Sequence, residues 1–180
     1  WGALPRYNFD ADNFNMWQYL DIHSNWTNGF WRVPGAFNDV AHKNGVKTGC
    51  TYFIDWGASV NQMEEPGKTL YELATPGTNS YGDKYKYSRK LIQFLKYYGI
   101  DGLCFNPEGY WGYTVYSRFI PFLAECHKIA KELNHPFHVD WYAFVSNTGA
   151  LSDNGRKLTT NNNNWFHHAA TNQPVTDVFF

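Results

Sequence analysis

The feature that most constrains the fold of this chain is a regular alternation of strand-like and helix-like segments. Strand composition marks residues 17–22, 46–54, 102–105 and 137–142, and a last strand begins near Asp177. Strands therefore recur at intervals of roughly 30–50 residues, as they do in parallel βαβ units. No GxGxxG motif follows the first strand and no GxxxxGK[ST] motif occurs, so a nucleotide-binding doubly wound sheet would lack its phosphate cradle. The pattern predicts a (β/α)8 barrel, or part of one.

The segments between these strands carry apolar residues at helical spacing. A short helix before Asn44-Gly45 places on one face Phe37, Val40 and Ala41. A second helix, over residues 86–98 and ended by Gly99, does so with Leu91, Ile92, Leu95 and Tyr98. A third, over about 115–133, does so with Phe119, Phe122, Leu123, Cys126, Ala130 and Leu133. Residues 55–85 are predicted to be a long loop with a short helix near Leu70.

Chain length indicates that the barrel is incomplete here. A whole barrel usually needs about 250 residues, whereas this chain has 180 and ends in the strand-like run Val178-Phe179-Phe180. We therefore expect residues 1–180 to be one partial barrel domain, an excerpt of a longer polypeptide.

Composition narrows the kinds of partner. The formal charge is −1, from 15 Lys+Arg against 16 Asp+Glu, so charge-driven binding of nucleic acid or anionic membranes is not expected. No apolar run approaches the ~20 residues that span a bilayer. Aromatic residues make up 19% and charged residues only 17%. An excess of rings fits sugar ligands, which stack on aromatic faces, and it equally fits a core packed with rings.

The cysteines and histidines give no sign of a metal site or of a cofactor. Cys50, Cys104 and Cys126 are odd in number and form no CxxC pair, which argues against both a zinc site and a disulfide framework. Cys50 and Cys104 are interpreted as small core residues. His167-His168 is an isolated pair, interpreted as surface histidine. We expect neither metal nor cofactor.

A candidate site for catalysis follows the strand at 102–105. In a barrel, active groups lie at the C-terminal ends of the strands. Residues two apart on a strand point to the same face, so Asn106 and Glu108 project together, with Cys104 below them. A carboxyl beside a carboxamide, just before the ring-rich loop 109–113, is a candidate general-acid site. The alternative is that Asn106 and Glu108 merely begin a loop and cap the next helix.

These residues carry a resemblance to a known family. The string DGLCFNPE at 101–108 lies in register with the DGxDxDxE signature of chitinase-like glycosidases, and its DG…N-x-E form resembles glycoside hydrolase family 85, the endo-β-N-acetylglucosaminidases. Residues 16–21 resemble that family's YWQYxD strand, 41–51 its AHRxGVxxxGT unit, 139–149 its IWYDS…G segment and 177–180 the start of its next strand. In the register of the family, the visible strands are roughly the second to the sixth of the barrel, and the first, seventh and eighth are missing.

The resemblance implies an activity and a set of catalytic residues. The family hydrolyses the β-1,4 bond of the N,N′-diacetylchitobiose core of N-linked glycans, with retention of configuration. Because the strand offers one carboxylate and one amide, the acetamido group of the substrate would attack the anomeric carbon and form an oxazoline, the substrate-assisted exception to the two-carboxylate rule. Glu108 would be the acid and then the base, Asn106 would hold the acetamide N–H, and Tyr142 would hydrogen-bond the acetamide.

Some positions depart from the family pattern, and the sugar-binding residues are less specific. The Asp that follows Trp-Tyr in the family is Ala143 here, and the aromatic-Ser-His run after its first visible strand is replaced by residues 24–26. Candidate sugar contacts are Trp111, which is favoured, Trp141, and the pair Asp55 and Trp56 after the second strand. For each tryptophan the alternative is a place in the core.

Two other functions remain open. A chitinase-like hydrolase would use the same DG frame, but it expects Asp at positions 104 and 106. A catalytically inactive, glycan-binding barrel would have no reason to keep a carboxyl at Glu108. The expected partner is an N-linked glycan or glycoprotein. A secreted or cell-surface bacterial location is favoured from the substrate, a cytoplasmic one is possible, and the oligomeric state is unknown.

Overall fold

The computed structural model describes residues 14–25, 33–54, 67–107, 112–141 and 171–179. These residues contain one sheet of five strands in the order β1-β2-β3-β4-β5, with every neighbouring pair parallel. The strands are β1 (Ile22–Asn25), β2 (Lys47–Ile54), β3 (Gly102–Pro107), β4 (His138–Trp141) and β5 (Val178–Phe179). Sequential parallel order is the strand order of a (β/α) barrel, so the α/β class and the partial barrel predicted from the alternation are confirmed.

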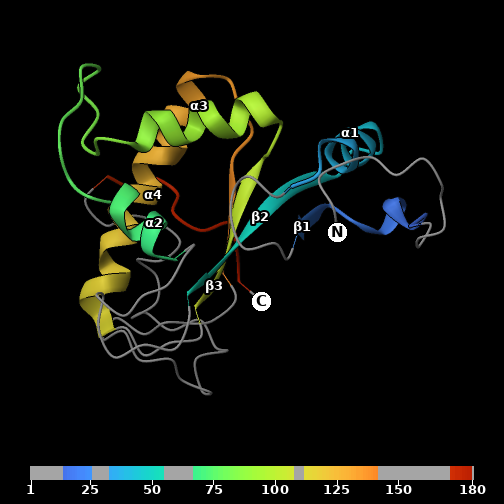
Figure 1. The fold of residues 1–180 in the computed structure, drawn as a ribbon, viewed down its shortest axis with the longest axis horizontal. Coiled ribbons are helices and arrows are strands. Elements are labelled where there is room, and N and C mark those ends of the chain that lie inside the picture. Colours follow the sequence, from blue (N-terminus) through green and yellow to red (C-terminus); the bar gives the residue numbers. More distant parts are fainter. Residues whose placement is uncertain (1–13, 26–32, 55–66, 108–111, 142–170, 180) are drawn as a thin grey trace.

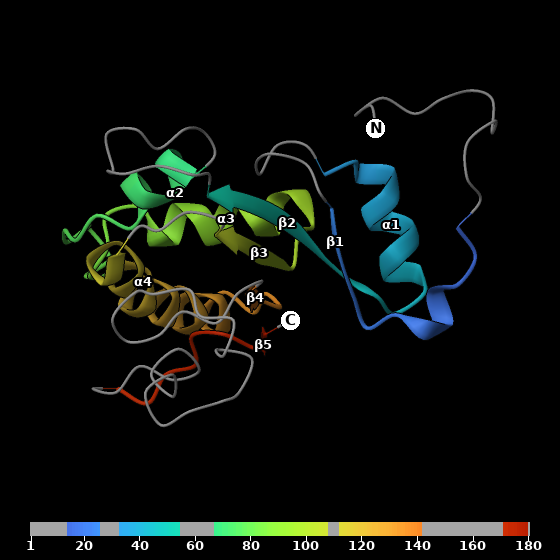
Figure 2. The same ribbon diagram turned by 90° about the horizontal axis from the view of Figure 1, so that it is seen from below.

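Helices connect the strands as a barrel requires. The helices are α1 (Gly35–Lys43), α2 (Gly67–Leu73), α3 (Ser88–Tyr98) and α4 (Gly112–Glu132), and a short 3-10 helix, η1 (Trp17–Tyr19), precedes β1. In Figure 1, α2, α3 and α4 lie together on one side of β2 and β3, and α1 lies at the β1 end of the sheet. Figure 2 shows the same grouping from below.

The hydrophobic core lies between the sheet and α2, α3 and α4. Every second strand residue faces it: Cys50 and Tyr52 from β2, Leu103 and Phe105 from β3, and Val139 from β4. The helices contribute apolar residues that include Leu70, Leu91, Ile92, Leu95, Phe119, Phe122, Leu123, Cys126 and Ala130. Because strand residues alternate between faces, the residues between these core positions face away from the helices, toward the barrel interior.

Two helices end on glycines in the left-handed conformation. Gly99 has φ 67° and follows α3, and its N–H bonds back to the carbonyl of Lys96. Gly45 has φ 77° and follows α1 and Asn44. A residue with a Cβ is strained at such φ values, which is why glycine marked both helix ends in the sequence.

Some predicted details are corrected. The first strand was expected at 17–22, but residues 17–19 form η1 and the strand runs from Ile22 to Asn25. Two residues expected on buried helix faces are largely exposed, namely Val40 of α1 at 42% and Tyr98 of α3 at 55%. In α1 the buried residues are Asn38 and Ala41, and Asn38 donates a hydrogen bond from Nδ2 to the carbonyl of Tyr98. A polar contact therefore joins α1 to the C-terminal end of α3.

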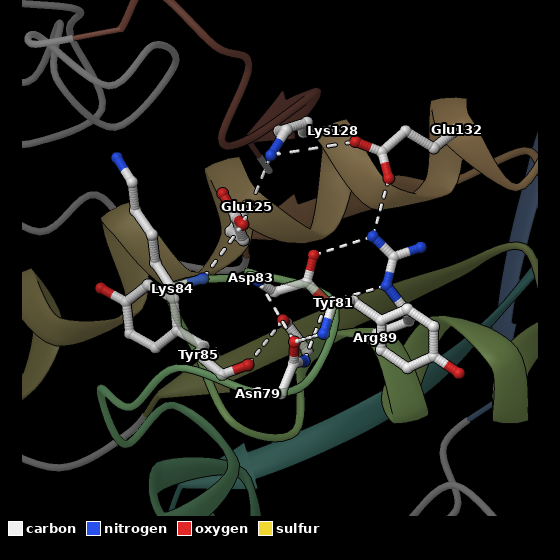
Figure 3. Close-up of polar contacts among 10 residues, drawn as sticks. Asn79, Tyr81, Asp83, Lys84, Tyr85, Arg89, Glu125, Lys128 and Glu132 are labelled. Carbon is white, nitrogen blue, oxygen red and sulfur yellow. Dashed lines mark hydrogen bonds and ion pairs between the residues drawn. The ribbon is translucent and has the colours of Figure 1, made fainter.

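The segment between α2 and α3 is fastened to α3 and α4 by a polar network, drawn in Figure 3. The Arg89 guanidinium donates from Nε and Nη2 to the two carboxylate oxygens of Asp83, both at 2.8 Å, and from Nη2 to Glu132 at 2.7 Å. Asn79 donates to Asp83 as well, at 2.8 Å, and Lys84 donates its backbone N–H to Glu125 at 3.2 Å. This network orders a glycine- and proline-rich loop without an apolar core of its own.

None of the helices in the described part of the chain is both long enough and apolar enough to span a bilayer.

Candidate active site

Strand register pairs the backbones of neighbouring strands in levels that rise toward the C-terminal ends of the strands. Ser24, Gly49, Gly102 and His138 share the lowest of these levels. Thr51, Cys104, Asp140 and Val178 share the next. Phe53 and Asn106 share the one above it. The catalytic end of a barrel is therefore the end at which Asn106 lies.

Asn106 is the one predicted catalytic residue within the described part of the chain. It lies in β3, which extends through Pro107 and not only to Phe105 as expected, and its backbone pairs with Phe53 of β2. The residue is 1% exposed. Its backbone is paired near the end of a strand, and a buried carboxamide is normally hydrogen-bonded, so the residue is held in place by the sheet. This position argues against the alternative that Asn106 merely begins a loop.

The other predicted site residues are not described. Glu108, Tyr142, Trp111, Asp55 and Trp56 lie outside the described residues. The backbone of Trp141 belongs to β4, where it pairs with Phe105, but its side chain is also outside the described part. The expected surface pair at 167–168 lies outside it too.

Below the level of Asn106, the structure places a buried polar group that sequence reasoning missed, formed by Ser24, His138 and Asp140. The Ser24 hydroxyl donates to Oδ2 of Asp140 at 3.2 Å, from the opposite side of β2 and β3. Nε2 of His138 lies 3.4 Å from the same Oδ2. His138 is 3% exposed and Asp140 is 5% exposed. The available signal was the two-residue spacing that puts Asp140 on the same face as Tyr142, one step below it.

Two glycines make room for this group. A Cβ on Gly102 would lie 2.5 Å from ring carbons of His138, and one on Gly49 would lie 2.6 Å from the Ser24 hydroxyl. Because neither β2 nor β3 has a side chain at this level, Ser24 can reach from β1 to Asp140 of β4, and the ring of His138 can lie over Gly102. The sequence thus creates a space in the barrel interior and fills it with polar atoms.

Cys104 sits beside this group as a protonated thiol. Burial raises its pKa to about 11, with a further contribution from the charge of Asp140, while hydrogen bonds with the side chains of Thr51 and Ser24 lower it. Both Cys50 and Cys104 are buried, as expected. Only Cys50 belongs to the hydrophobic core, where burial raises the pKa of its thiol strongly, and Cys104 faces the polar interior. With its thiol protonated at neutral pH, Cys104 is unsuited to nucleophilic attack.

Asp101, at the other end of β3, is structural. Its Oδ2 accepts hydrogen bonds from the backbone N–H of Thr48 at 2.8 Å and lies 2.7 Å from Nε2 of His42. These contacts tie the start of β3 to the start of β2 and to α1. They lie at the N-terminal end of the strands, where barrel residues contribute to stability and not to chemistry.

Other features of the described residues do not form a competing site. A cavity of about 360 Å³ lies between α4, the segment 76–85 and residues 171–173, away from the strand ends. Among the described residues, no group of three or more His, Cys, Asp or Glu side chains is arranged to hold a metal ion. The polar groups near the strand ends are therefore the amide of Asn106 and, on the next strand and lower, the carboxylate of Asp140. Such an arrangement can hold an N–H group of a ligand and stabilise positive charge on it.

Comparison with solved structures finds a similar fold. The chain superposes on the glycoside hydrolase domain of Endo-D from Streptococcus pneumoniae R6 with a TM-score of 0.69 and 24% sequence identity, over 93% of this chain and 25% of that one. The chain thus spans about a quarter of the length of that structure. A β-L-arabinopyranosidase from Geobacillus stearothermophilus aligns over 59% of this chain and 28% of its own, with 14% identity and a TM-score of 0.30, too low to support an argument. A search of curated proteins finds no significant match.

The family is established at the level of sequence. The family model for glycosyl hydrolase family 85 matches residues 3–180, almost the whole chain. The match includes the DGLCFNPE segment and the β2 and β4 segments on which the resemblance rested. The chain belongs to glycosyl hydrolase family 85.

Proposed function

We propose that the protein containing this chain is an endo-β-N-acetylglucosaminidase. In this proposal it hydrolyses the GlcNAc-β-1,4-GlcNAc bond in the chitobiose core of N-glycans, and residues 1–180 form part of its catalytic barrel. Membership of family 85 supports the reaction class. The observation that carries the proposal is the buried Asn106 at the C-terminal end of β3, two residues before Glu108 in the sequence.

The proposed mechanism needs only one carboxylate at the strand end because the substrate supplies the nucleophile. The carbonyl oxygen of the 2-acetamido group attacks the anomeric carbon and forms an oxazoline that is still protonated on nitrogen, while Glu108 protonates the departing glycosidic oxygen. Glu108 then removes a proton from the water that opens the oxazoline. Because the nucleophile is held within the substrate, the attack gains the rate advantage of proximity.

Asn106 and Tyr142 orient the acetamido group in this proposal. The Asn106 carbonyl accepts the acetamide N–H, on which positive charge develops during the attack. The Tyr142 hydroxyl hydrogen-bonds the acetamide and fixes its angle. Trp111, Trp141, Trp56 and Asp55 are the proposed contacts to neighbouring sugars, and the substrate is an N-linked glycan or glycoprotein.

Release of the glycan from a glycoprotein by the full-length protein tests the proposal. The wild type should release N-glycans and leave one GlcNAc on the protein. Glu108→Gln removes the group that transfers the proton and should lower turnover by about 10²–10⁴-fold. Mass spectrometry of the deglycosylated protein measures both the release and the retained sugar.

A matched variant and a second substrate make the result specific. Glu72→Gln makes the same chemical change at an exposed position of α2 and should leave turnover unchanged. Chitin oligomers should be poor substrates, and preferential cleavage of them would favour the chitinase-like reading. Near-normal glycan release by Glu108→Gln would exclude the assignment of Glu108 as acid and base.

A further inference from the structure

The candidate catalytic end of β3 contains no charge of its own within the described residues. Asn106 is a neutral amide, and Cys104 below it is a protonated thiol. In the interior levels from Ser24 up to Asn106, Asp140 carries the one carboxylate that the structure describes. The reaction proposed above places positive charge on the acetamido group that Asn106 would hold. A neutral amide orients that charge but does not neutralise it.

Asp140 lies close enough to act on that charge. The backbone of Asp140 pairs with Cys104, which is two residues before Asn106. Asp140 is therefore the diagonal neighbour of Asn106 on the adjacent strand, two residues lower. A rise of 3.3 Å per residue and a strand separation of 4.8 Å put the two Cα atoms roughly 8 Å apart. At a separation of about 8 Å in a buried site with an effective dielectric constant near 20, the attraction between two opposite unit charges changes an equilibrium constant by more than tenfold.

The surroundings of Asp140 hold its carboxylate in one orientation. Oδ2 accepts the Ser24 hydroxyl proton and faces Nε2 of His138. Oδ1 is buried and has no hydrogen-bond partner among the described residues. Burying a carboxylate is costly unless hydrogen bonds or opposite charges stabilise it. The arrangement also requires glycine at positions 49 and 102, because a Cβ at either position would clash with Ser24 or His138. A built setting of this kind indicates a role for the charge.

We propose that Asp140 is a positioning residue that supplies the negative charge for the substrate-assisted step. The inference rests on the function proposed above and deepens it. As the acetamide oxygen bonds to C1 and the glycosidic C1–O bond breaks, the bonding electrons leave with the glycosidic oxygen, which takes its proton from Glu108. The acetamide nitrogen becomes positive, and Asp140 stabilises it through space. Asp140 gives and takes no proton.

A purely structural role is the alternative, and kinetics separate the two. Asp140→Asn keeps the shape and an acceptor for the Ser24 hydroxyl, and it removes the charge. Loss of the charge should lower kcat on N-glycan by about 10–100-fold, with KM within about threefold, because the positive charge exists only in the transition state and the intermediate. Ser24→Ala releases the carboxylate and should change kcat in the same direction by less.

The chain offers a matched control for losing a buried aspartate. Asp101 is 4% exposed against 5% for Asp140, and it also contacts a histidine, but it lies at the opposite end of the strands. Asp101→Asn should lower the melting temperature and leave kcat within about threefold. All rates are measured below the melting transition of each variant. If Asp140→Asn and Asp101→Asn lowered stability alike and neither changed kcat, Asp140 would be structural.

Binding of mimics of the intermediate can be measured without turnover. This measurement tests the role of Asp140 separately from the proposed function. The probes are two N-acetylglucosamine derivatives that mimic the cyclic intermediate, a neutral methylthiazoline and the corresponding imidazoline in its cationic form. Asp140→Asn should weaken binding of the cation about tenfold more than binding of the neutral mimic, measured by calorimetry. Equal weakening would overturn the inference and leave the proposed function standing. A wild type that releases no glycan and binds neither mimic would overturn both.

Discussion

Two partly buried histidines in the described part of the chain have defined hydrogen-bonding partners. They are His127 and His135: Nε2 of His135 lies 2.9 Å from the carbonyl of Ile100, and Nε2 of His127 lies 3.3 Å from that of Val175. Burial lowers the pKa of both imidazoles, although the nearby Asp177 opposes this for His127. Both side chains are therefore held neutral in the folded protein over a wider pH range than in the unfolded chain.

This difference predicts a stability that falls on mild acidification. In the unfolded chain a histidine takes up a proton near pH 6.5, whereas the folded protein takes it up only at lower pH. Below pH 6.5 the unfolded state binds more protons, so the free energy of unfolding decreases as the pH falls toward the folded pKa. Urea unfolding at pH 7.5 and 5.5 should show a loss of roughly 1–3 kcal/mol.

A substitution assigns this loss to a particular imidazole. His127→Gln keeps a polar side chain that does not titrate, so the variant should lose less stability than the wild type between the two pH values. Equal pH dependence of the wild type and His127→Gln would rule out His127 as a source.

At the scale of elements, helix positions could be predicted and the ends of strands could not. Glycines and apolar spacing placed α1, α3 and most of α4, because both signals are local. The strand β1 was placed too early because its inward side chain, Ser24, is polar and is stabilised by Asp140, a residue 116 positions away. Likewise β3 continues through Pro107 because it pairs with β2 as far as Ile54, and Pro107 itself favours an extended Asn106.

The candidate site could be predicted for the same reason only in part. The DGLCFNPE segment is local, and the family signal in it located Asn106. The polar group of Ser24, His138 and Asp140 depends on register across four strands and on two glycines that leave space. Neither register nor available space can be read from one segment at a time.

The network around Arg89 gives a prediction at this scale. Arg89 neutralises Asp83, whose side chain is 2% exposed, and hydrogen bonding by Arg89 is the main reason that the pKa of Asp83 is lowered. Arg89→Met would leave a buried carboxylate without its cation, so the protein should lose about 3–5 kcal/mol of stability. Thermal or chemical denaturation measures the loss.

A neighbouring cation in the same network is the control. Lys128 bridges Glu125 and Glu132 at 3.6 and 3.8 Å, but its side chain is 48% exposed. Lys128→Met should cost less than about 1 kcal/mol, as exposed ion pairs do. Losses of similar size for the two variants would contradict the view that burial of Asp83 decides the energy. Glycan hydrolysis by both folded variants should remain close to that of the wild type.

At the scale of the whole chain, the parallel strands of this family 85 member carry polar residues on their interior face, from the level of Ser24 up to Asn106 at the C-terminal end of β3. Helices cover the other face, so the chemistry and the hydrophobic core occupy opposite sides of the same strands (Figures 1 and 2). The proposed function requires that Asn106 acts on the substrate and does not merely hold the fold together. That claim is the centre of the proposed function.

Asn106→Ala, assayed in the full-length protein with two donors, tests this claim most directly. In the proposed mechanism the acetamide of a natural glycan needs Asn106 for its attack, whereas a preformed sugar oxazoline has already passed that step and needs only Glu108 to activate the acceptor. The variant should therefore hydrolyse glycoprotein at least about 100-fold more slowly, and it should still transfer the glycan from the oxazoline to a GlcNAc acceptor. A melting curve controls for folding. Equal loss of activity on both donors would contradict the role of Asn106 in forming the oxazoline.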